Sequence, residues 1–194
     1  MLYNNTETKI IREIYLNKSI HKRQLSRNLR LSMPSIEYAL KKLPKFIKKE
    51  KIGNQLHYSL EYSNPELSAV LGVVESGRLA NLPPKIRLAV ADLLAELDPK
   101  PLLALIFGSY SRGDFTNSSD LDILLIFQSI TNPEQICHNI SMRTNLQISP
   151  IYLDYEQFRK SFADSTKDFF KEIKRDKLLL VGIEWWRQLE SKTA

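Results

Sequence analysis

Two aspartates separated by one residue are the part of the sequence best suited to chemistry. Asp120 and Asp122 open an apolar run that ends at Phe127. Side chains two positions apart on a strand point to the same face, so the carboxylates should lie together, with their Cα atoms roughly 6–7 Å apart. Two like charges at the lip of a buried strand repel each other and lose solvation, and a divalent cation relieves both effects. The pair therefore predicts a metal site.

A glycine-serine pair precedes the first of these aspartates, with ten residues between them. Gly108-Ser109 follows the apolar run Leu102–Phe107, and it fits a tight exit from a strand into a helical turn. Such a turn presents free backbone N–H groups that can bind phosphate. Leu102–Phe107 and Ile123–Phe127 show no polar alternation, which is typical of strands buried on both faces. A phosphate-binding turn beside paired carboxylates predicts a metal–nucleotide site.

The pattern Gly108-Ser109-x10-Asp120-x-Asp122, with Arg112-Gly113 in the gap, resembles the signature of the polymerase-beta-type nucleotidyltransferase superfamily. It is most similar to the minimal nucleotidyltransferases of that superfamily. The resemblance covers Leu102–Phe127 without a gap, and the two apolar runs lie where the family has its strands. It implies a small mixed sheet flanked by helices.

The same resemblance implies roles for the site residues. Asp120 and Asp122 would hold Mg²⁺, with Mn²⁺ as the alternative ion, and Gly108 and Ser109 would bind the triphosphate. The implied reaction moves a nucleoside monophosphate from an NTP, with ATP as the first choice, to an acceptor and releases pyrophosphate. Arg112 has two interpretations: a contact to the nucleotide phosphates, or a structural ion pair that holds the turn.

The sequence departs from the family pattern at one point. Active members place a third carboxylate on a later strand, where it helps to hold the metal and acts as a base toward the acceptor hydroxyl. The expected strand is 147–153, and Ser149 occupies the expected place. Asp154 is the nearest substitute, either as a catalytic carboxylate or as the N-cap of a helix in a capping box with Gln157. Nucleotide and Mg²⁺ binding are thus expected, whereas turnover is left open.

Length and composition limit the classes of protein to which the chain can belong. The 194 residues, 43% of them hydrophobic, suffice for one large or two small packed domains and argue against disorder. No apolar run approaches the roughly 18–20 residues of a membrane span, and the polar, mixed-charge N-terminus does not resemble a signal peptide. Cys137 is the only cysteine, and the three histidines are scattered. A disulfide framework and a Cys-based zinc site are excluded, and a cytoplasmic protein is expected.

The basic charge is concentrated in the first third of the chain. Residues 1–62 carry 13 Lys and Arg against 5 Asp and Glu, whereas the remainder carries 15 against 17. This asymmetry indicates two functional units, the first of which faces a polyanion.

The first third also shows a recognisable order of elements. Helices are expected at residues 6–17, 21–29 and 32–43, followed by a hairpin over Phe46–Leu60 that turns at Gly53-Asn54. This order resembles a winged helix-turn-helix domain, with the third helix in the major groove and the hairpin on phosphates. A helical domain kept soluble by its lysines and a protein-docking module stay open. The candidate nucleic-acid-binding residues are Ser35, Tyr38, Lys41, Lys42, Lys48, Lys49 and Lys51.

The rest of the chain alternates helices and strands. Helices over 65–79 and 85–97 form an expected helical connector, residues 63–100, that packs on the C-terminal domain. In residues 101–194 the two apolar strands are followed by further elements: a helix at 133–145, a strand at 146–153, helices from 155 and 168, a strand at 178–181 and a C-terminal helix. The predicted class is α+β, with a winged helix-turn-helix domain (1–62), the connector, and a mixed-sheet nucleotidyltransferase domain.

Two functional hypotheses follow. The first is an Mg²⁺-dependent nucleotidyltransferase coupled to a winged helix that binds duplex DNA, with a protein hydroxyl, a nucleic-acid end or a small molecule as acceptor. The second is a transcriptional regulator that binds nucleotide and transfers it weakly or not at all. A protein that uses its basic domain to dock an acidic partner is a weaker third. No membrane partner is expected, and a homodimer stays open because oligomeric state cannot be read from the residues.

Overall fold

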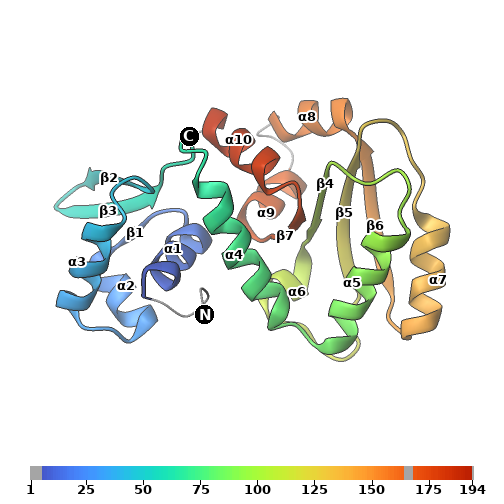
Figure 1. Ribbon diagram of the computed structural model, residues 1–194, viewed down its shortest axis with the longest axis horizontal. Helices are drawn as coiled ribbons and strands as arrows, with labels where there is room; N and C mark the ends of the chain where they lie inside the picture. Colours follow the sequence, from blue (N-terminus) through green and yellow to red (C-terminus); the bar gives the residue numbers. More distant parts are fainter. Residues whose placement is uncertain (1–5, 164–167, 194) are drawn as a thin grey trace. The chain divides into compact units, whose positions relative to one another are not determined.

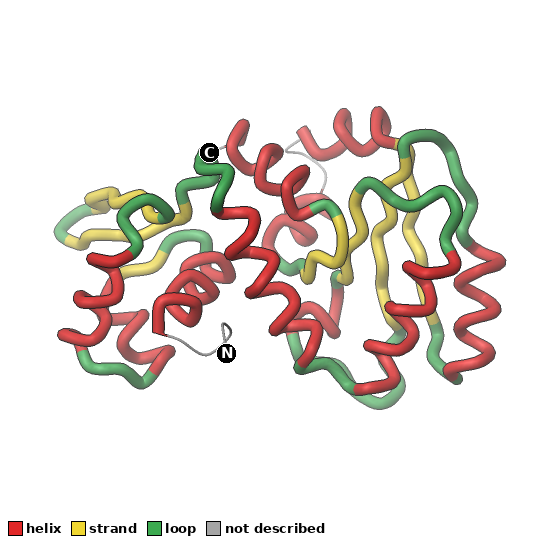
Figure 2. The backbone as a smooth tube through the Cα atoms, in the orientation of Figure 1, coloured by secondary structure: helices red, strands yellow, loops and turns green. Residues whose placement is uncertain are grey.

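The structure is a computed structural model that describes residues 6–163 and 168–193. It has the expected mixed α+β composition (Figures 1 and 2). The described chain divides into two compact units. One contains the residues up to Val74 and those from Trp186 onward, and the other contains Glu75–Trp185.

The first unit combines three helices with a small antiparallel sheet. Its elements are α1 (Thr6–Asn17), β1 (Ile20–His21), α2 (Lys22–Leu29), α3 (Met33–Lys42), β2 (Ile47–Ile52), β3 (Gln55–Leu60) and the first part of α4 (Leu67–Ala80). The strand order is β1-β3-β2. The expected helices and hairpin are present, and β1 is an addition because two residues are too short to show an alternating pattern.

Local capping explains where these elements begin and end. The Ser32 side chain accepts a hydrogen bond from the Ser35 N–H at the start of α3, which satisfies one free donor of the first helical turn. Arg30 ends α2 in the left-handed conformation. Gly53 makes the hairpin turn with φ +59°, a conformation that glycine adopts without strain.

The core of the first unit is built from apolar faces of its helices and from β3. It includes Ile10, Ile11, Ile14, Tyr15, Ile20, Leu25, Ile36, Ala39, Leu40, Tyr58 and Leu60. The end of the chain also contributes, through α10 (Ile183–Thr193). Trp186 is fully buried, and the Arg187 guanidinium donates to the Ser68 hydroxyl (3.0 Å) and to the Tyr62 carbonyl.

The second unit is built around a four-stranded mixed sheet. After α5 (Pro84–Glu96) its elements are β4 (Leu103–Ile106), α6 (Gly108–Arg112), β5 (Leu121–Phe127), α7 (Glu134–Thr144), β6 (Ile148–Asp154), α8 (Tyr155–Ala163), α9 (Asp168–Arg175) and β7 (Leu178–Val181). The strand order is β6-β5-β4-β7. β4 is antiparallel to both of its neighbours, and β5 is parallel to β6. The predicted mixed sheet is confirmed, and β6 lies at an edge, as Pro150 indicates.

Both faces of the sheet are covered. Ile123, Leu125 and Phe127 of β5 join one core cluster with buried residues of α5 and α7, and these two helices lie next to each other in Figure 1. The neighbouring β5 residues alternate to the other face, where α8 contacts β5 and β6. All five residues from Ile123 to Phe127 are buried, which explains the uninterrupted apolar run.

The three-part organisation expected from the sequence (1–62, 63–100 and 101–194) concerns function and stays a prediction. The two compact units have other boundaries, because the chain leaves the first unit within α4 and returns to it within α10. Among the helices of the described residues, none has both the length and the apolar composition needed to cross a membrane.

Candidate functional site

A hollow of about 460 Å³ lies in the second unit where β4, α6 and β5 meet. It is lined by Phe107, Gly108, Ser109, Arg112, Ser119, Asp120, Asp122 and Glu172. The five residues that the sequence assigns to metal and nucleotide in this region thus line one pocket: Gly108, Ser109, Arg112, Asp120 and Asp122.

Backbone pairing brings the glycine turn against the second aspartate. The Phe107 N–H donates to the Asp122 carbonyl (3.1 Å), so the chain enters α6 directly beside β5. Gly108 then has φ +66°, and a Cβ atom built on it would lie 2.3 Å from Asp122 Oδ2. Any side chain at this position would be strained and would displace the carboxylate. Position 108 therefore requires glycine for both conformation and space.

The two aspartates differ in burial. Asp120 is exposed just before β5 and Asp122 is half-buried within it, while Leu121 between them points into the core. Burial raises the pKa of the Asp122 carboxyl, and the negative charges of Asp120 and Glu172 add to this effect, while Arg112 opposes it. The ionised Asp122 is thus poorly solvated and is repelled by Asp120, and a bound cation would relieve both effects.

The loop that leads to Asp120 is fixed by Tyr110. Its ring stacks on Phe115 with centroids 4.6 Å apart, and its hydroxyl donates to the Ser119 carbonyl (3.4 Å). The Ser119 hydroxyl in turn accepts the Thr116 N–H (2.8 Å). Burial, followed by the charge of Asp120, raises the pKa of the Tyr110 hydroxyl, which places the phenol near that carboxylate. The loop can therefore hold Asp120 in a defined position.

Arg112 has the partners of a structural ion pair and also lines the pocket. Its Nε donates to Asp114 Oδ2 (3.1 Å), and its NH1 group lies 3.4 Å from Glu172 Oε1. The guanidinium is about one-third exposed. Both interpretations of Arg112 are compatible with this geometry, because these two carboxylates leave donors that could reach a phosphate.

A buried arginine in α4 braces the site from behind. Arg78, with 8% of its side chain exposed, donates to Glu75 Oε2 (2.8 Å), to the Ser111 carbonyl of α6 (2.9 Å) and to the Lys177 carbonyl before β7 (2.6 Å). One guanidinium thus links the glycine-serine turn to the end of the segment that carries α9. The sequence analysis missed this residue because nothing in its spacing distinguishes it from other arginines on amphipathic helices.

The position expected for a third carboxylate is occupied by serine. Ser149 pairs with Asp122 across β5 and β6, so β6 supplies a hydroxyl beside the second aspartate. Asp154 pairs with Phe127 at the far end of the two strands, five residues or roughly 16 Å from Ser149. Its carboxylate accepts the Gln157 N–H (2.8 Å). The geometry fits the helix-cap interpretation of Asp154, and the residues that line the pocket do not include it.

Glu172 is a pocket residue that the sequence analysis did not identify. It lies on α9, fifty positions after Asp122, and belongs to no spacing pattern. α9 is held by buried Phe170 and Ile173, and Phe169 packs edge-on against Phe107 at a centroid distance of 5.5 Å. These contacts bring a third carboxylate to the pocket from a helix.

The donor set suits a hard divalent cation. Asp120 and Asp122 offer carboxylate oxygens, and Ser109 offers a hydroxyl on the same pocket wall. Mg²⁺ prefers oxygen ligands and usually binds through one or two carboxylates plus substrate phosphates and water. Within residues 6–163 and 168–193, no three His, Cys, Asp or Glu side chains are grouped closely enough to hold a metal ion by themselves. The two carboxylates and the hydroxyl fit an ion that takes its other ligands from phosphate or water.

The residues proposed to bind nucleic acid lie on the surface of the first unit. On α3, Tyr38 is 64% exposed, and Lys42 lies 4.3 Å above its ring and 3.4 Å from Glu7 Oε1. Lys41 is exposed, and the Ser35 hydroxyl hydrogen-bonds to that of Ser32 (2.8 Å). Ser35 thus takes part in the cap of α3.

The hairpin lysines are divided between two faces. Lys49 pairs with Tyr58 and Lys51 with Leu56, whereas Lys48 pairs with Ser59 and therefore points to the opposite face. Lys48 also lies 3.5 Å from Glu61 Oε1. A polyanion on one face of the hairpin would meet Lys49 and Lys51 but not Lys48.

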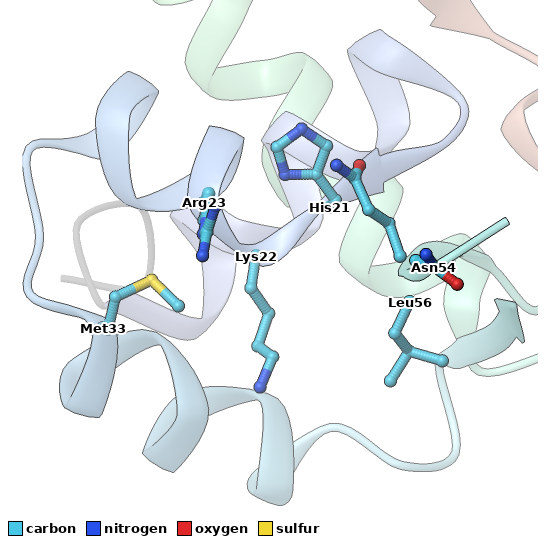
Figure 3. Close-up of a pocket in the computed structure, with 7 residues that line it drawn as sticks. His21, Lys22, Arg23, Met33, Asn54 and Leu56 are labelled. Carbon is cyan, nitrogen blue, oxygen red and sulfur yellow. The ribbon is translucent and has the colours of Figure 1, made fainter. Parts of the chain in front are cut away.

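A second hollow, of about 360 Å³, lies between the start of α2 and the hairpin of the same unit. Figure 3 shows the Lys22 side chain extending between Met33 of α3 and Leu56 of β3, with Arg23 nearby. Lys22 is paired with Glu37 Oε1 at 2.6 Å, and this hydrogen bond raises the pKa of its ammonium group. The hollow is bordered by cationic and amide side chains, which suits an anionic ligand.

Comparisons with known proteins find similarity to nucleotidyltransferases. A family model described as "Polymerase beta, Nucleotidyltransferase" matches residues 90–182. A protein of Methanocaldococcus jannaschii, named as a proposed protein adenylyltransferase, is 27% identical over 88 residues, which cover 42% of this chain and 88% of that protein. A crystal structure of a proposed nucleotidyltransferase from Sulfolobus solfataricus is 22% identical, covers 54% of this chain and 84% of that chain, and has a TM-score of 0.31. Residues 90–182 are therefore similar to the nucleotidyltransferases that the sequence pattern resembles.

Proposed function

We propose that the second unit binds a magnesium-chelated NTP in the pocket of α6 and β5 and transfers a nucleoside monophosphate to an acceptor. The observation that carries this proposal is the convergence of Gly108, Ser109, Asp120 and Asp122 on one pocket inside the stretch that matches the family model. Phosphate-binding backbone and paired carboxylates are the two parts that a metal–nucleotide site needs.

Each part of the pocket has a distinct role in this proposal. Asp120 and Asp122 hold Mg²⁺ or Mn²⁺, which neutralises phosphate charge and polarises the phosphoryl oxygens when bound. Ser109 and the backbone of the turn bind the outer phosphates. Arg112 offers its guanidinium donors to the same phosphates, and the loop fixed by Tyr110 keeps Asp120 in place. ATP is the proposed donor, in line with the name of the archaeal relative.

Pyrophosphate release tests this proposal. The protein is incubated with labelled ATP, Mg²⁺ and cell extract as the source of acceptors, and release is compared with that of Asp122→Asn. Release by the wild-type protein that the variant loses supports the transferase. Asp168→Asn is the matched control, because Asp168 is exposed and forms an ion pair with Lys171 one helical turn away. A release equal in wild type and Asp122→Asn would refute the assignment.

A regulator that binds nucleotide without transferring it is the second candidate. Ser149 favours it, because serine stands where a carboxylate is expected beside Asp122 and a serine hydroxyl is a poor base. The same assay separates the two candidates. Stabilisation of the protein by Mg²⁺–ATP without any pyrophosphate release identifies the regulator.

The first unit is proposed to be a winged helix-turn-helix domain that binds duplex DNA. Its order of elements, with β1 and β2 on either side of β3, and the excess of basic residues support this proposal. Tyr38, Lys41 and Lys42 of α3 with Lys49 and Lys51 of the hairpin are the proposed contacts. Affinity for duplex DNA should fall steeply with salt, since several phosphate contacts release counterions. A flat salt response would refute the proposal, and an acidic protein partner would then be the alternative.

The acceptor and the assembly complete the proposal. A protein hydroxyl is the proposed acceptor, because the archaeal relative is named as a proposed protein adenylyltransferase. Labelling of a protein band in the extract, sensitive to Asp122→Asn, tests this choice against a nucleic-acid end or a small molecule. The functional boundaries near residues 63 and 101, a homodimer and a cytoplasmic location stay predictions.

A further inference from the structure

The transfer reaction needs a group that accepts the proton of the acceptor hydroxyl. A hydroxyl is a weak nucleophile near neutral pH unless a base within hydrogen-bond reach removes its proton. Asp120 and Asp122 are committed to the cation, which makes their carboxylates poor bases. Ser149, the β6 residue beside Asp122, offers no carboxylate, and Asp154 caps α8 at the far end of the strand.

One carboxylate in the pocket remains. Glu172 lines the same hollow as the two aspartates, and its charge contributes to the raised pKa of Asp122, so it lies within electrostatic reach. Among the described residues no three acidic side chains are close enough to share a metal ion. Glu172 comes from α9, whereas the two aspartates belong to β5 and to the loop before it. About half of its side chain is exposed, which leaves it open to an acceptor that approaches from solvent.

The backbone of Glu172 is fixed well enough for such a role. Buried Phe170 and Ile173 anchor α9, and Phe169 packs on Phe107, the residue that precedes the phosphate-binding turn. Arg78 links the turn to the Lys177 carbonyl at the end of the α9 segment. The turn and the glutamate thus belong to one braced arrangement.

Arg112 links this carboxylate to nucleotide binding. Its guanidinium pairs with Glu172 at 3.4 Å, and a phosphate is a strong competing partner for arginine. A triphosphate that draws Arg112 away would leave Glu172 unpaired and more basic only when the nucleotide is bound. Before that, the negative charge of Glu172 in the same pocket weakens the attraction of the pocket for a polyanion.

We infer that Glu172 is the proton acceptor of the transfer reaction, released from Arg112 when the nucleotide binds. The acceptor oxygen forms a bond to the α-phosphorus as its proton passes to the Glu172 carboxylate. The bond from the α-phosphorus to the bridging oxygen breaks, and pyrophosphate leaves with that electron pair. The proton then passes to solvent. This inference rests on the proposed transferase function.

The test compares binding and turnover in Glu172→Gln. We expect kcat for pyrophosphate release to fall by about 100-fold or more, while Mg²⁺–ATP binds at least as tightly as to the wild type, because a competing charge is removed. Loss of both affinity and turnover would show a structural role and overturn the inference. Asp168→Asn on the same helix is the control and should change neither quantity.

Two further variants test whether Glu172 accepts a proton or is needed only for the structure of the pocket. Glu172→Asp keeps a carboxylate and should recover part of the lost rate. Glu172→Ala should be rescued in part by added formate, which can accept the proton from solution. Failure of both rescues overturns the inference, as does a Glu172→Gln variant with wild-type kcat. If Asp122→Asn releases as much pyrophosphate as the wild type, both the transferase proposal and this inference are refuted. If the wild type is active and Glu172→Gln keeps the same kcat, only this inference is refuted.

Discussion

The acidic pocket of the second unit and the basic surface of the first differ in how their residues are held. In the pocket, backbone pairing, a glycine with no room for a side chain and a buried arginine define each position. On the basic surface, the lysines of α3 and of the hairpin are exposed, and those of the hairpin are divided between two faces. The pocket can therefore fix a chemical geometry, whereas the surface can offer little more than charge.

Gly108→Ala should have the largest effect on the pocket. The new Cβ would lie 2.3 Å from Asp122 Oδ2 at a φ of +66°, so the turn and the carboxylate cannot both keep their positions. We expect pyrophosphate release to fall by at least about 100-fold, since displacement by about 1 Å has effects of this order.

Gly113→Ala is its matched control. Gly113 also has a positive φ (+86°), but its added Cβ would have no heavy atom within 4 Å. It should lose stability through backbone strain of roughly 1–2 kcal/mol and keep most of the activity. Equal losses of activity in both variants would show that strain, and not contact with Asp122, limits position 108.

Arg78→Met tests the brace behind the pocket. It leaves the Glu75 carboxylate, which is 1% exposed, without the guanidinium, and breaking a buried pair costs about 3–5 kcal/mol. Denaturant unfolding of the variant measures this loss. Arg159→Met removes the same i,i+3 pairing from an exposed Arg–Glu pair and should change stability by less than about 1 kcal/mol. A similar change in both variants would contradict the brace.

A double replacement of Lys49 and Lys51 by Ala addresses the basic surface. If a polyanion binds that face, duplex affinity should fall by roughly tenfold, and the slope of log K against log salt should become shallower by about two. Lys48→Ala is the control, because Lys48 points to the other face and pairs with Glu61. Equal effects of all three lysines would show that the affinity for duplex DNA depends on total charge and not on one face of the hairpin.

The smallest expected effect concerns the stability of the metal-free pocket. Burial raises the pKa of Asp122 in the folded state, so its ionised form opposes folding. This carboxyl contributes most to stability below its unfolded pKa, roughly 4, and the contribution is lost as pH rises through the folded pKa. With a chelator at pH 7, Asp122→Asn should therefore raise Tm by about 1–2 °C, and the gain should vanish near pH 4. A lower Tm at pH 7 would contradict this assignment.

The pocket could be predicted from the sequence because the spacing of its residues along two strands fixes their relative positions. Gly108-Ser109 and Asp120-x-Asp122 are each attached to a buried strand, and adjacent strands leave few arrangements for them. The order of helices and the hairpin followed from caps such as Ser32 and from the turn at Gly53. The capping box also predicted the cap contact of Asp154, whose carboxylate accepts the Gln157 N–H at the start of α8.

Glu172 and Arg78 could not be found in the same way. Both reach the pocket region through tertiary packing: α9 by its buried phenylalanine and isoleucine, and α4 by hydrogen bonds to carbonyls 33 and 99 residues away. Local sequence patterns do not reveal contacts between residues that lie so far apart in the chain. The division of the hairpin lysines, in contrast, follows from strand alternation and could have been predicted from the register alone.

The return of α10 to the first unit bears on how the halves can be prepared separately. A fragment that stops after Val74 lacks Trp186, which is fully buried, and Arg187, whose guanidinium reaches Ser68 and the Tyr62 carbonyl. Such a fragment should expose the apolar surface that the indole normally covers. Trp185 is 40% exposed and belongs to the other unit. The two adjacent indoles are therefore fluorescent reporters of different units. Replacing one of them by phenylalanine would allow the unfolding of the unit that contains the other to be followed separately.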